Sequence, residues 1–256
     1  MNTLAIIGAG NLAASIAPAF KMSGVKIVGI YSRNYEHAVS LAERVGVQPV
    51  RSIQELGDAG FYLLSVADSC IGEVASQLPK SDAIVLHTSG SVNIDVLKPY
   101  CANYGALYPF QTFSVARPVK DFSSIPVYIE ANSENTLVKL RELAGEISGK
   151  VSVLDSGKRM GLHIAGVFSC NFVNNLLSCA FDICKKFGID PQNMKPLVDE
   201  TLQKAFSSGN PKEMQTGPAV RGDMATVEKH LNLLQENPEH QKIYQLMSEC
   251  ILMNNK

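Results

Sequence analysis

The sequence predicts an α/β fold, with a doubly wound and mainly parallel sheet, followed by an all-α region. Short apolar runs alternate with amphipathic stretches through the first half of the chain. The runs are apolar throughout, which is typical of parallel strands covered by helices on both faces. Strand patterns stop after about Asp155. We therefore expect two domains, residues 1–154 and residues 155–256.

The expected strands of the α/β part are short and apolar. They are "TLAIIG", "VKIVGIYS", residues 48–50, "GFYLLSV", "DAIVLHT", "GALYPF", "IPVYIEA" and "KVSVLD". Helices are expected at residues 11–23 and 69–77, in "NYEHAVSLAERVG" and in "SENTLVKLRELAGEIS". Gly46 ends the segment "NYEHAVSLAERVG" as a C-cap glycine would.

The second part of the chain is expected to contain helices only. A long helix is predicted over about residues 158–187, and the next one has Pro191 in its first turn. Asp223 can act as the N-cap of "MATVEKHLNLLQEN", after a Gly- and Pro-rich loop. A final helix is expected from Pro238 to about Met253.

The composition is that of a globular protein, since 46% of the 256 residues are hydrophobic and 18% are charged. The net charge of −1 and the lack of any run of Lys or Arg argue against nucleic acid or an anionic membrane as a partner. The six cysteines show no zinc-like spacing, so no metal site is predicted. The scattered cysteines and an N-terminus that lacks a signal-peptide pattern both favour the cytoplasm.

Residues 160–181 carry no Asp, Glu, Lys or Arg and are long enough to cross a bilayer. They include His163 and several asparagines, which are costly in lipid. We therefore predict a buried central helix and no membrane span. Because this stretch is apolar on more faces than one small domain can bury, we also expect a homodimer joined through the helical domain.

The segment "LAIIGAGNLAAS" places glycines between the first expected strand and the first expected helix. Gly8 permits a tight turn, Gly10 lets a pyrophosphate approach the backbone, and Ala13 is small enough for the helix to pack on the strand. The N–H groups at the start of that helix would face the phosphates. We predict a dinucleotide site that begins with Gly8, Ala9, Gly10, Asn11 and Leu12. A tight turn without a ligand is the alternative.

The end of the second strand bears on the choice of cofactor. NAD sites usually carry a carboxylate there, whereas NADP sites present an arginine to the 2′-phosphate. Here Ser32 and Arg33 follow the strand, and no acid occurs before Glu36. Arg33 can form a forked contact with phosphate, so NADP is the predicted cofactor. An ordinary surface arginine is the alternative.

Three further strand ends face the same crevice, and the third of them, residues 108–112, is assigned no particular contact. Val66, Ala67 and Asp68 are expected to contact the cofactor, although Asp68 is explained equally well as a helix cap. At the end of "DAIVLHT" we expect substrate contacts from His87, Thr88, Ser89 and Gly90. The alternative for this segment is a turn whose polar groups are satisfied by the protein itself.

A polar stripe runs along the long predicted helix. His163, Asn171, Asn174 and Ser178 fall within an arc of about 80° at about 100° per residue. We expect the stripe to face the cleft between the domains. His163 and Asn171 are then the catalytic candidates, with Asn174 placed to contact the substrate. A structural role for His163 is the alternative, and His87 is the competing proton donor.

The Gly- and Pro-rich loop before Asp223 contains one further candidate. Arg221 lies close to two glycines and could hold an anionic group of the substrate or cofactor.

The whole chain resembles a known type, the two-domain reductases that join a Rossmann domain to a helical domain like the C-terminal part of 6-phosphogluconate dehydrogenase. The resemblance is carried by "GAGNLA", "HTSG", "YPFQTF", "HIAGVFSCNFVNNLL" and "TGPAVRGDMATVEKHL". Pyrroline-5-carboxylate reductase and the deazaflavin-dependent NADP oxidoreductases are related examples. Within this group the chain is most similar to an uncharacterised Rossmann-like family whose C-terminal domain has no known function.

One departure from these relatives bears on the chemistry. The resemblance implies, for the β-hydroxyacid dehydrogenase branch, a catalytic Lys three residues before an Asn pair. Here the pair is Asn174-Asn175, and Asn171 stands at the Lys position. Because Asn171 replaces the Lys, the general acid of that branch is missing, and its chemistry cannot be transferred. A second difference is that relatives often have His-Pro where this chain has Tyr108-Pro109.

Two functions are compatible with these observations. The first is an NADP(H)-dependent oxidoreductase acting on a small carbonyl, imine or hydroxy substrate. The second is a non-catalytic NADP-binding sensor or regulatory protein, which the missing Lys favours and the polar stripe opposes. The fold alone cannot choose between them, because the same architecture serves both.

Overall fold

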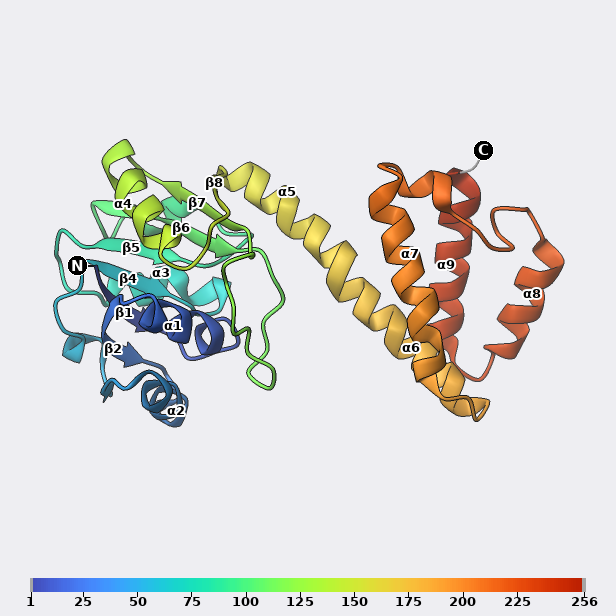
Figure 1. Ribbon diagram of the computed structural model, residues 1–256, viewed down its shortest axis with the longest axis horizontal. Coiled ribbons are helices and arrows are strands. Elements are labelled where there is room, and N and C mark those ends of the chain that lie inside the picture. Colours follow the sequence, from blue (N-terminus) through green and yellow to red (C-terminus); the bar gives the residue numbers. More distant parts are fainter. Residues whose placement is uncertain (1, 255–256) are drawn as a thin grey trace. The chain divides into compact units, whose positions relative to one another are not determined.

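The computed structural model describes residues 2–254 (Figure 1). Residues up to Asn171 form one compact unit, and residues from Phe172 onward form a second. Within the described residues, every strand lies in the first unit and the second contains helices only. This confirms the expected α/β sheet followed by an all-α region.

The first unit is built on one mainly parallel sheet. Its strands are β1 (Thr3–Ile7), β2 (Lys26–Tyr31), β3 (Pro49–Val50), β4 (Phe61–Leu64), β5 (Ile84–His87), β6 (Asn103–Pro109), β7 (Val127–Ala131) and β8 (Val151–Val153). They lie in the order β3-β2-β1-β4-β5-β6-β7-β8. All neighbours are parallel except β6 and β7, which are antiparallel. The doubly wound topology that the sequence predicts is confirmed.

Alternate residues of the strands belong to two separate hydrophobic cores. Leu4 and Ile6 pack with α1 (Ala13–Met22), α2 (Tyr35–Val45) and α4 (Glu134–Gly145). Ala5 and Ile7 pack instead with α3 (Ile71–Ser76) and the short 3-10 turns near it. Because both faces of the sheet are covered, the strand residues are apolar at successive positions.

The long helix is divided into three segments, α5 (Ser156–Gly166), a π-helical segment (Val167–Phe172) and α6 (Val173–Lys186). Since a π-helix has wider turns than an α-helix, the residues after it are rotated relative to a regular α-helical register. The arc expected for the polar stripe therefore does not hold across this segment. The boundary between the two compact units also lies in this segment, between Asn171 and Phe172.

Most of the long helix is not buried within either unit taken by itself. Ser156–Lys186 is, among the described residues, the helix whose length and apolar composition would suit a membrane span, and none of its most apolar window is buried. Phe181 and Phe187 are examples of its exposed apolar side chains. The expectation of a buried central helix is thus not met within either unit taken by itself, because periodicity indicates an apolar face and not what covers it.

Within residues 172–254, the second unit contains α6, three further α-helices and short 3-10 turns. The three further helices are α7 (Lys195–Ser207), α8 (Met224–Leu233) and α9 (Pro238–Asn254). Asp223 accepts a hydrogen bond from the Thr226 amide at 3.1 Å, so the predicted N-cap of α8 is confirmed. Its pKa lies below the ordinary value, chiefly because of the Thr226 hydroxyl and amide that it accepts from.

Candidate functional site

The carboxyl ends of the central strands are aligned at one edge of the sheet (Figure 1). Ile7 is in register with Tyr31 and with Leu64, and Leu64 is in register with His87. Ligands of open α/β sheets bind at this edge. The segments that begin there start at Gly8, Ser32, Ser65 and Thr88.

Gly8 begins the turn from β1 to α1. Its φ is +105°, and a Cβ at this position would lie 2.0 Å from the Ser65 carbonyl oxygen. Only glycine is therefore compatible with this turn. A Cβ added to Gly10 would meet no atom within 4 Å, so there is open space beside its backbone. The N-terminus of α1 has no side-chain cap and no acidic residue in its first turn, so its N–H groups suit an anion.

A pocket of about 500 Å³ lies at this turn. Seven of the predicted cofactor residues line it, namely Gly8, Ala9, Gly10, Ser32, Arg33, Val66 and Ala67. Sequence reasoning missed Cys70, Glu73 and Gln77, which come from the turn before α3 and from α3 and its end. The sequence could have indicated them, because the helix expected at residues 69–77 begins directly after the strand end that was predicted to contact the cofactor.

Arg33 is exposed and makes no ion pair with any residue of the described chain. The neighbouring Asn34 caps α2 by accepting from the Glu36 amide at 3.1 Å. The Arg51 guanidinium stacks on the Tyr35 ring at 3.9 Å instead of lining the pocket. Arg33 is therefore the arginine at this strand end whose charge is available to a bound phosphate.

Three predicted cofactor residues do not line this pocket. Asn11 Oδ1 accepts from the Val115 amide at 3.0 Å, and Leu12 is the N-cap residue of α1. Asp68 accepts from the Ser91 hydroxyl at 2.5 Å and caps no helix, so the cap interpretation of Asp68 is wrong. The contacts of Asn11 and Asp68 join segments that are distant in the sequence, which spacing alone does not reveal.

The turn after β5 is largely satisfied by internal hydrogen bonds. Thr88 Oγ1 donates to the Leu64 carbonyl at 3.4 Å, and Ser89 Oγ accepts from the amides of Ser91 and Val92, each at 3.0 Å. These bonds support the alternative of a self-satisfied turn for Thr88 and Ser89. They also hold the backbone of the turn in one conformation.

His87 is completely buried at the end of β5. Its Nδ1 accepts from the Ser89 amide at 3.2 Å, and its Nε2 has no partner among residues 2–254. Burial, with the nearby Arg159 charge, lowers the pKa of His87 to about 3. The ring is therefore neutral near pH 7, which makes it a poor source of a proton.

His163 and Tyr108 form a hydrogen-bonded pair inside the first unit. His163 Nδ1 on α5 lies 3.1 Å from Tyr108 Oη, near the end of β6. Gly90 lies against both rings. Burial raises the pKa of Tyr108 above its ordinary value, with Arg159 opposing and Asp68 adding to the shift. The sequence analysis placed Tyr108 at a strand end that faces the crevice but did not include it among the predicted site residues.

The pair lines a pocket of about 330 Å³ that also contains Asn171. Phe110, Thr112, Val167 and Ser169 are among the other lining residues, and no Asp, Glu, Lys or Arg of the described chain lines it. The two predicted catalytic residues, His163 and Asn171, thus share one pocket. Part of its wall is the π-helical segment, a feature often found at functional sites.

Arg159 is a further residue that sequence reasoning missed. Its side chain is 1% exposed and forms an ion pair with Glu130 on β7. It also donates to the carbonyls of Ser89 at 3.2 Å and Val92 at 2.6 Å. The guanidinium therefore joins α5 to the turn after β5 and to the far part of the sheet.

Asn174 and Arg221, predicted to contact the substrate, belong to the second unit. Asn174 is exposed on α6, and Arg221 is exposed in the loop before α8. Gly217 and Gly222 of that loop adopt positive φ values of 116° and 67°. The roles of Asn174 and Arg221 stay predictions.

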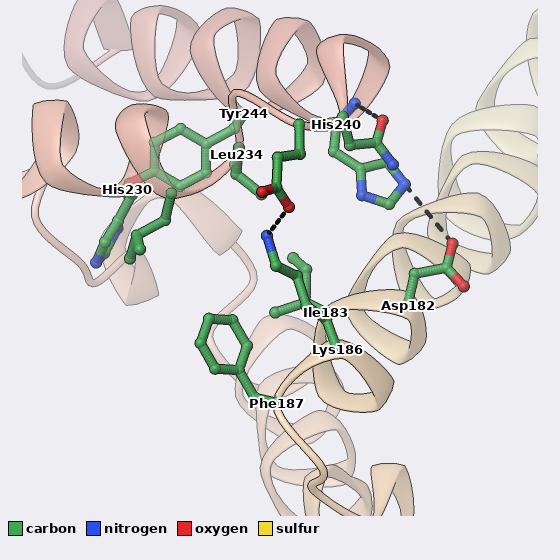
Figure 2. A pocket seen from close by; sticks show the side chains of 11 residues that line it. Asp182, Ile183, Lys186, Phe187, His230, Leu234, His240 and Tyr244 are labelled. Carbon is green, nitrogen blue, oxygen red and sulfur yellow. Dashed lines mark hydrogen bonds and ion pairs between the residues drawn. The ribbon is translucent and has the colours of Figure 1, made fainter.

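The second unit contains a pocket of its own, of about 390 Å³, between the end of α6 and residues of α8 and α9 (Figure 2). Its polar side chains are paired with one another. Lys186 Nζ lies 2.7 Å from a Glu236 carboxylate oxygen, and His230 Nδ1 lies 2.7 Å from Tyr244 Oη. None of the predicted site residues lines this pocket.

Two family models match the chain. "NADP oxidoreductase coenzyme F420-dependent" matches residues 3–91, and "Domain of unknown function (DUF2520)" matches residues 125–251. No curated protein matches the chain. The two models correspond to the glycine-turn part of the sheet and to the later, mostly helical part.

Solved structures show the same fold over almost the whole chain. A reductive aminase from Aspergillus terreus in complex with NADPH and ethyl-5-oxohexanoate is 13% identical, with a TM-score of 0.73, and the alignment covers 99% of this chain and 94% of that one. A pyrroline-5-carboxylate reductase from Coxiella burnetii is 14% identical, with a TM-score of 0.59 and 98% of each chain covered. At these identities the likeness concerns the fold alone.

One relative is more similar. A candidate NADP oxidoreductase from Bacteroides fragilis is 36% identical, with a TM-score of 0.91 and 98% of each chain covered. The resemblance inferred from the sequence is confirmed by this match and by the two family models. The chain therefore belongs to the family of NADP-oxidoreductase-like proteins in which a Rossmann-type sheet is followed by the helical domain of unknown function.

Proposed function

We propose that the protein is an NADP(H)-dependent oxidoreductase that acts on a small carbonyl, imine or hydroxy substrate. The observation that carries the proposal is the pocket shared by His163, Tyr108 and Asn171. It combines a histidine, a residue type that titrates near neutral pH, with aromatic surface and a side-chain amide. A lining without Asp, Glu, Lys or Arg among the described residues suits an uncharged reacting group.

The first pocket fits the cofactor of this family. The open space at Gly10 and the uncapped N-terminus of α1 suit a pyrophosphate. The exposed Arg33 suits the 2′-phosphate of NADP. When bound, the cofactor supplies or accepts the hydride, and the residues of the chain hold and orient the reactants.

In the direction of reduction, His163 supplies the proton that balances the hydride. An N–H bond of the protonated ring breaks and an O–H or N–H bond forms on the substrate. The Asn171 amide can orient the substrate by hydrogen bonding. His87, neutral and without exposed surface, serves the packing of the β5 turn.

The test is NADPH oxidation with a defined carbonyl panel, ethyl levulinate, ethyl-5-oxohexanoate and cyclohexanone, the last with and without allyl amine. Ethyl-5-oxohexanoate and ethyl levulinate each occur with NADPH, and cyclohexanone occurs with allyl amine, in reductive aminase structures of the same fold. Turnover of any of them supports the proposal. NADPH binding is measured directly in parallel. Tight binding without turnover of any compound in the panel would favour a non-catalytic NADP-binding protein.

Arg33→Ala is expected to weaken NADPH binding about tenfold to a hundredfold and to leave NADH binding nearly unchanged. Removing a charge-assisted contact with the 2′-phosphate costs about 1.5–3 kcal/mol. The affinities are measured by calorimetric titration. Arg51→Ala is the matched control, because Arg51 stacks on Tyr35 outside the pocket. Equal losses for both cofactors, or no loss, would show that Arg33 does not select NADP.

A non-catalytic NADP-binding sensor is the second candidate function. It is favoured by Asn171, which stands where the dehydrogenase branch has its catalytic Lys. On this alternative the protein binds NADPH tightly, and the His163 pocket takes no reacting substrate. The free state of all six cysteines in the described chain supports a reducing compartment, and we propose the cytoplasm for either candidate.

We further propose that the protein is a homodimer joined through the helical unit. Exposed apolar side chains occur on α6, α7 and α9, for example Phe181, Leu197 and Leu246. A groove of about 340 Å³ on the same unit is lined mainly by apolar residues. Sedimentation velocity at micromolar concentration is expected to show a dimer, and Leu246→Glu is expected to weaken it. A monomer for the unmodified chain would contradict this proposal.

A further inference from the structure

The direction of the hydrogen bond between Tyr108 and His163 follows from the partners that each group has. The Tyr108 hydroxyl carries one proton and makes no other hydrogen bond with a described side chain or backbone group. If His163 Nδ1 donates to Oη, the half-buried phenol O–H has no second acceptor in the described part of the unit, and only a molecule in the pocket can accept its proton. The arrangement of the neutral ring that satisfies both atoms within the protein is the one in which Oη donates to Nδ1 and the ring proton lies on Nε2.

Protonation of His163 reverses this bond. With protons on both nitrogens, Nδ1–H donates to Tyr108 Oη, and the phenol proton becomes free to donate to a molecule in the pocket. Both residues line that pocket. The raised pKa of the phenol means that Tyr108 does not act by becoming a phenolate. It can pass a proton only if it receives one at the same time.

The pair is held in place by the neighbouring turn. A Cβ on Gly90 would lie 2.7 Å from His163 Nδ1 and 2.8 Å from Tyr108 Cζ, so glycine provides the space that the pair occupies. The turn cannot move back easily, because Arg159 donates to the carbonyls of Ser89 and Val92 on either side of Gly90. Gly90, predicted to contact the substrate, is better explained by this packing.

We infer that Tyr108 is a catalytic residue that transfers the proton of His163 to the substrate. As the substrate atom takes the phenol proton, the Nδ1–H bond breaks and a new O–H bond forms on Tyr108. The phenol is unchanged, His163 ends neutral with its proton on Nε2, and the substrate gains one proton. The inference rests on the proposed oxidoreductase function, because that reaction consumes the proton.

The first test reads the proton position without any turnover. Nitrogen-15 NMR of the histidine rings, assigned with His163→Asn, is recorded at a pH where the ring of His163 is neutral. We expect Nε2 to be protonated and Nδ1 to be unprotonated in the unmodified chain. Tyr108→Phe is expected to change the tautomer ratio about fivefold towards the Nδ1–H form, the effect of one hydrogen bond.

Gly90→Ala is a second variant that keeps both side chains of the pair. A methyl group there must push the rings apart, so the same direction of change in the tautomer ratio is expected. Gly161→Ala is its matched control on α5, since no atom lies within 4 Å of a Cβ at that position. A protonated Nδ1 in the neutral unmodified chain, or an unchanged ratio in both variants, would overturn the inference.

The second test uses NADPH oxidation with the carbonyl panel. Tyr108→Phe is expected to lower kcat about a hundredfold with little change in KM. Because the two groups act in series, the Tyr108→Phe/His163→Asn double variant should lose no more than the stronger single variant. Multiplying losses would contradict a shared path. Tyr128→Phe on β7 is the control, since its ring contacts Phe110 but lies outside the pocket.

The two tests separate the inference from the proposed function. If NMR shows the expected tautomer but no compound of the panel is turned over, the hydrogen-bonded pair is supported and the proposed oxidoreductase function is contradicted. If Tyr108→Phe retains full turnover, the oxidoreductase function is supported and the role of Tyr108 in proton transfer is contradicted.

Discussion

Replacing His163 by asparagine is expected to lower turnover on the carbonyl panel by about a hundredfold or more. Asparagine can occupy a similar volume and form hydrogen bonds, but it cannot carry the proton that the reduction consumes. NADPH affinity should be unchanged, because His163 does not line the pocket at the glycine turn. The measurement is kcat for NADPH oxidation beside a calorimetric titration with NADPH.

His87→Asn is the control for this variant. His87 is buried and neutral near pH 7, and burial lowers its pKa to about 3. Turnover should therefore be retained in the fraction of the protein that folds, as judged by circular dichroism. Full activity in His163→Asn, with a specific loss in His87→Asn, would assign the proton to His87. A failure of His163→Asn to fold would instead support a structural role for that residue.

Arg159→Met is expected to lower the free energy of unfolding by about 3–5 kcal/mol. The side chain is 1% exposed, and its removal leaves Glu130, 17% exposed, without its cation. The carbonyls of Ser89 and Val92 lose their donor in the same step. Methionine keeps much of the apolar volume, so the loss reflects the polar contacts. Urea unfolding followed by circular dichroism provides the measurement.

Lys158→Met is the matched control for Arg159→Met. Lys158 is the preceding residue, and its ion pair with Asp155 joins two exposed side chains at 3.3 Å. Exposed pairs of this kind contribute less than about 1 kcal/mol. Similar losses in the two variants would show that the contacts of Arg159 do not stabilise this part of the fold.

The glycine turn illustrates what could be predicted from the sequence. The strand before Gly8, the small residues after it and the position of Arg33 at the next strand end are all local patterns. The structure places Gly8 at positive φ against the Ser65 carbonyl, as a tight turn requires. The same reasoning did not identify Cys70, in the turn before α3, or Glu73, in α3, because their contact with the pocket also depends on the strand order that places β4 beside β1.

The long helix illustrates where local reasoning fails. Its apolar composition indicated a buried helix, yet none of its most apolar window is buried within the two units taken separately. Hydrophobic periodicity describes which residues avoid water and carries no information on what covers them. The π-helical segment also changes the angular relation between Asn171 and the residues after it, which a constant angle per residue cannot anticipate.

The sequence by itself determined the alternation of strands and helices, the dinucleotide turn and the candidates His163 and Arg33. These features depend on the conformations of neighbouring residues and on the spacing of residues within one helix or strand. Only the tertiary structure decided that His163 meets Tyr108, 55 positions away, and that Arg159 reaches the Ser89 carbonyl, 70 positions away. Such contacts arise where β6, α5 and the turn after β5 pack together, so no spacing within one element encodes them.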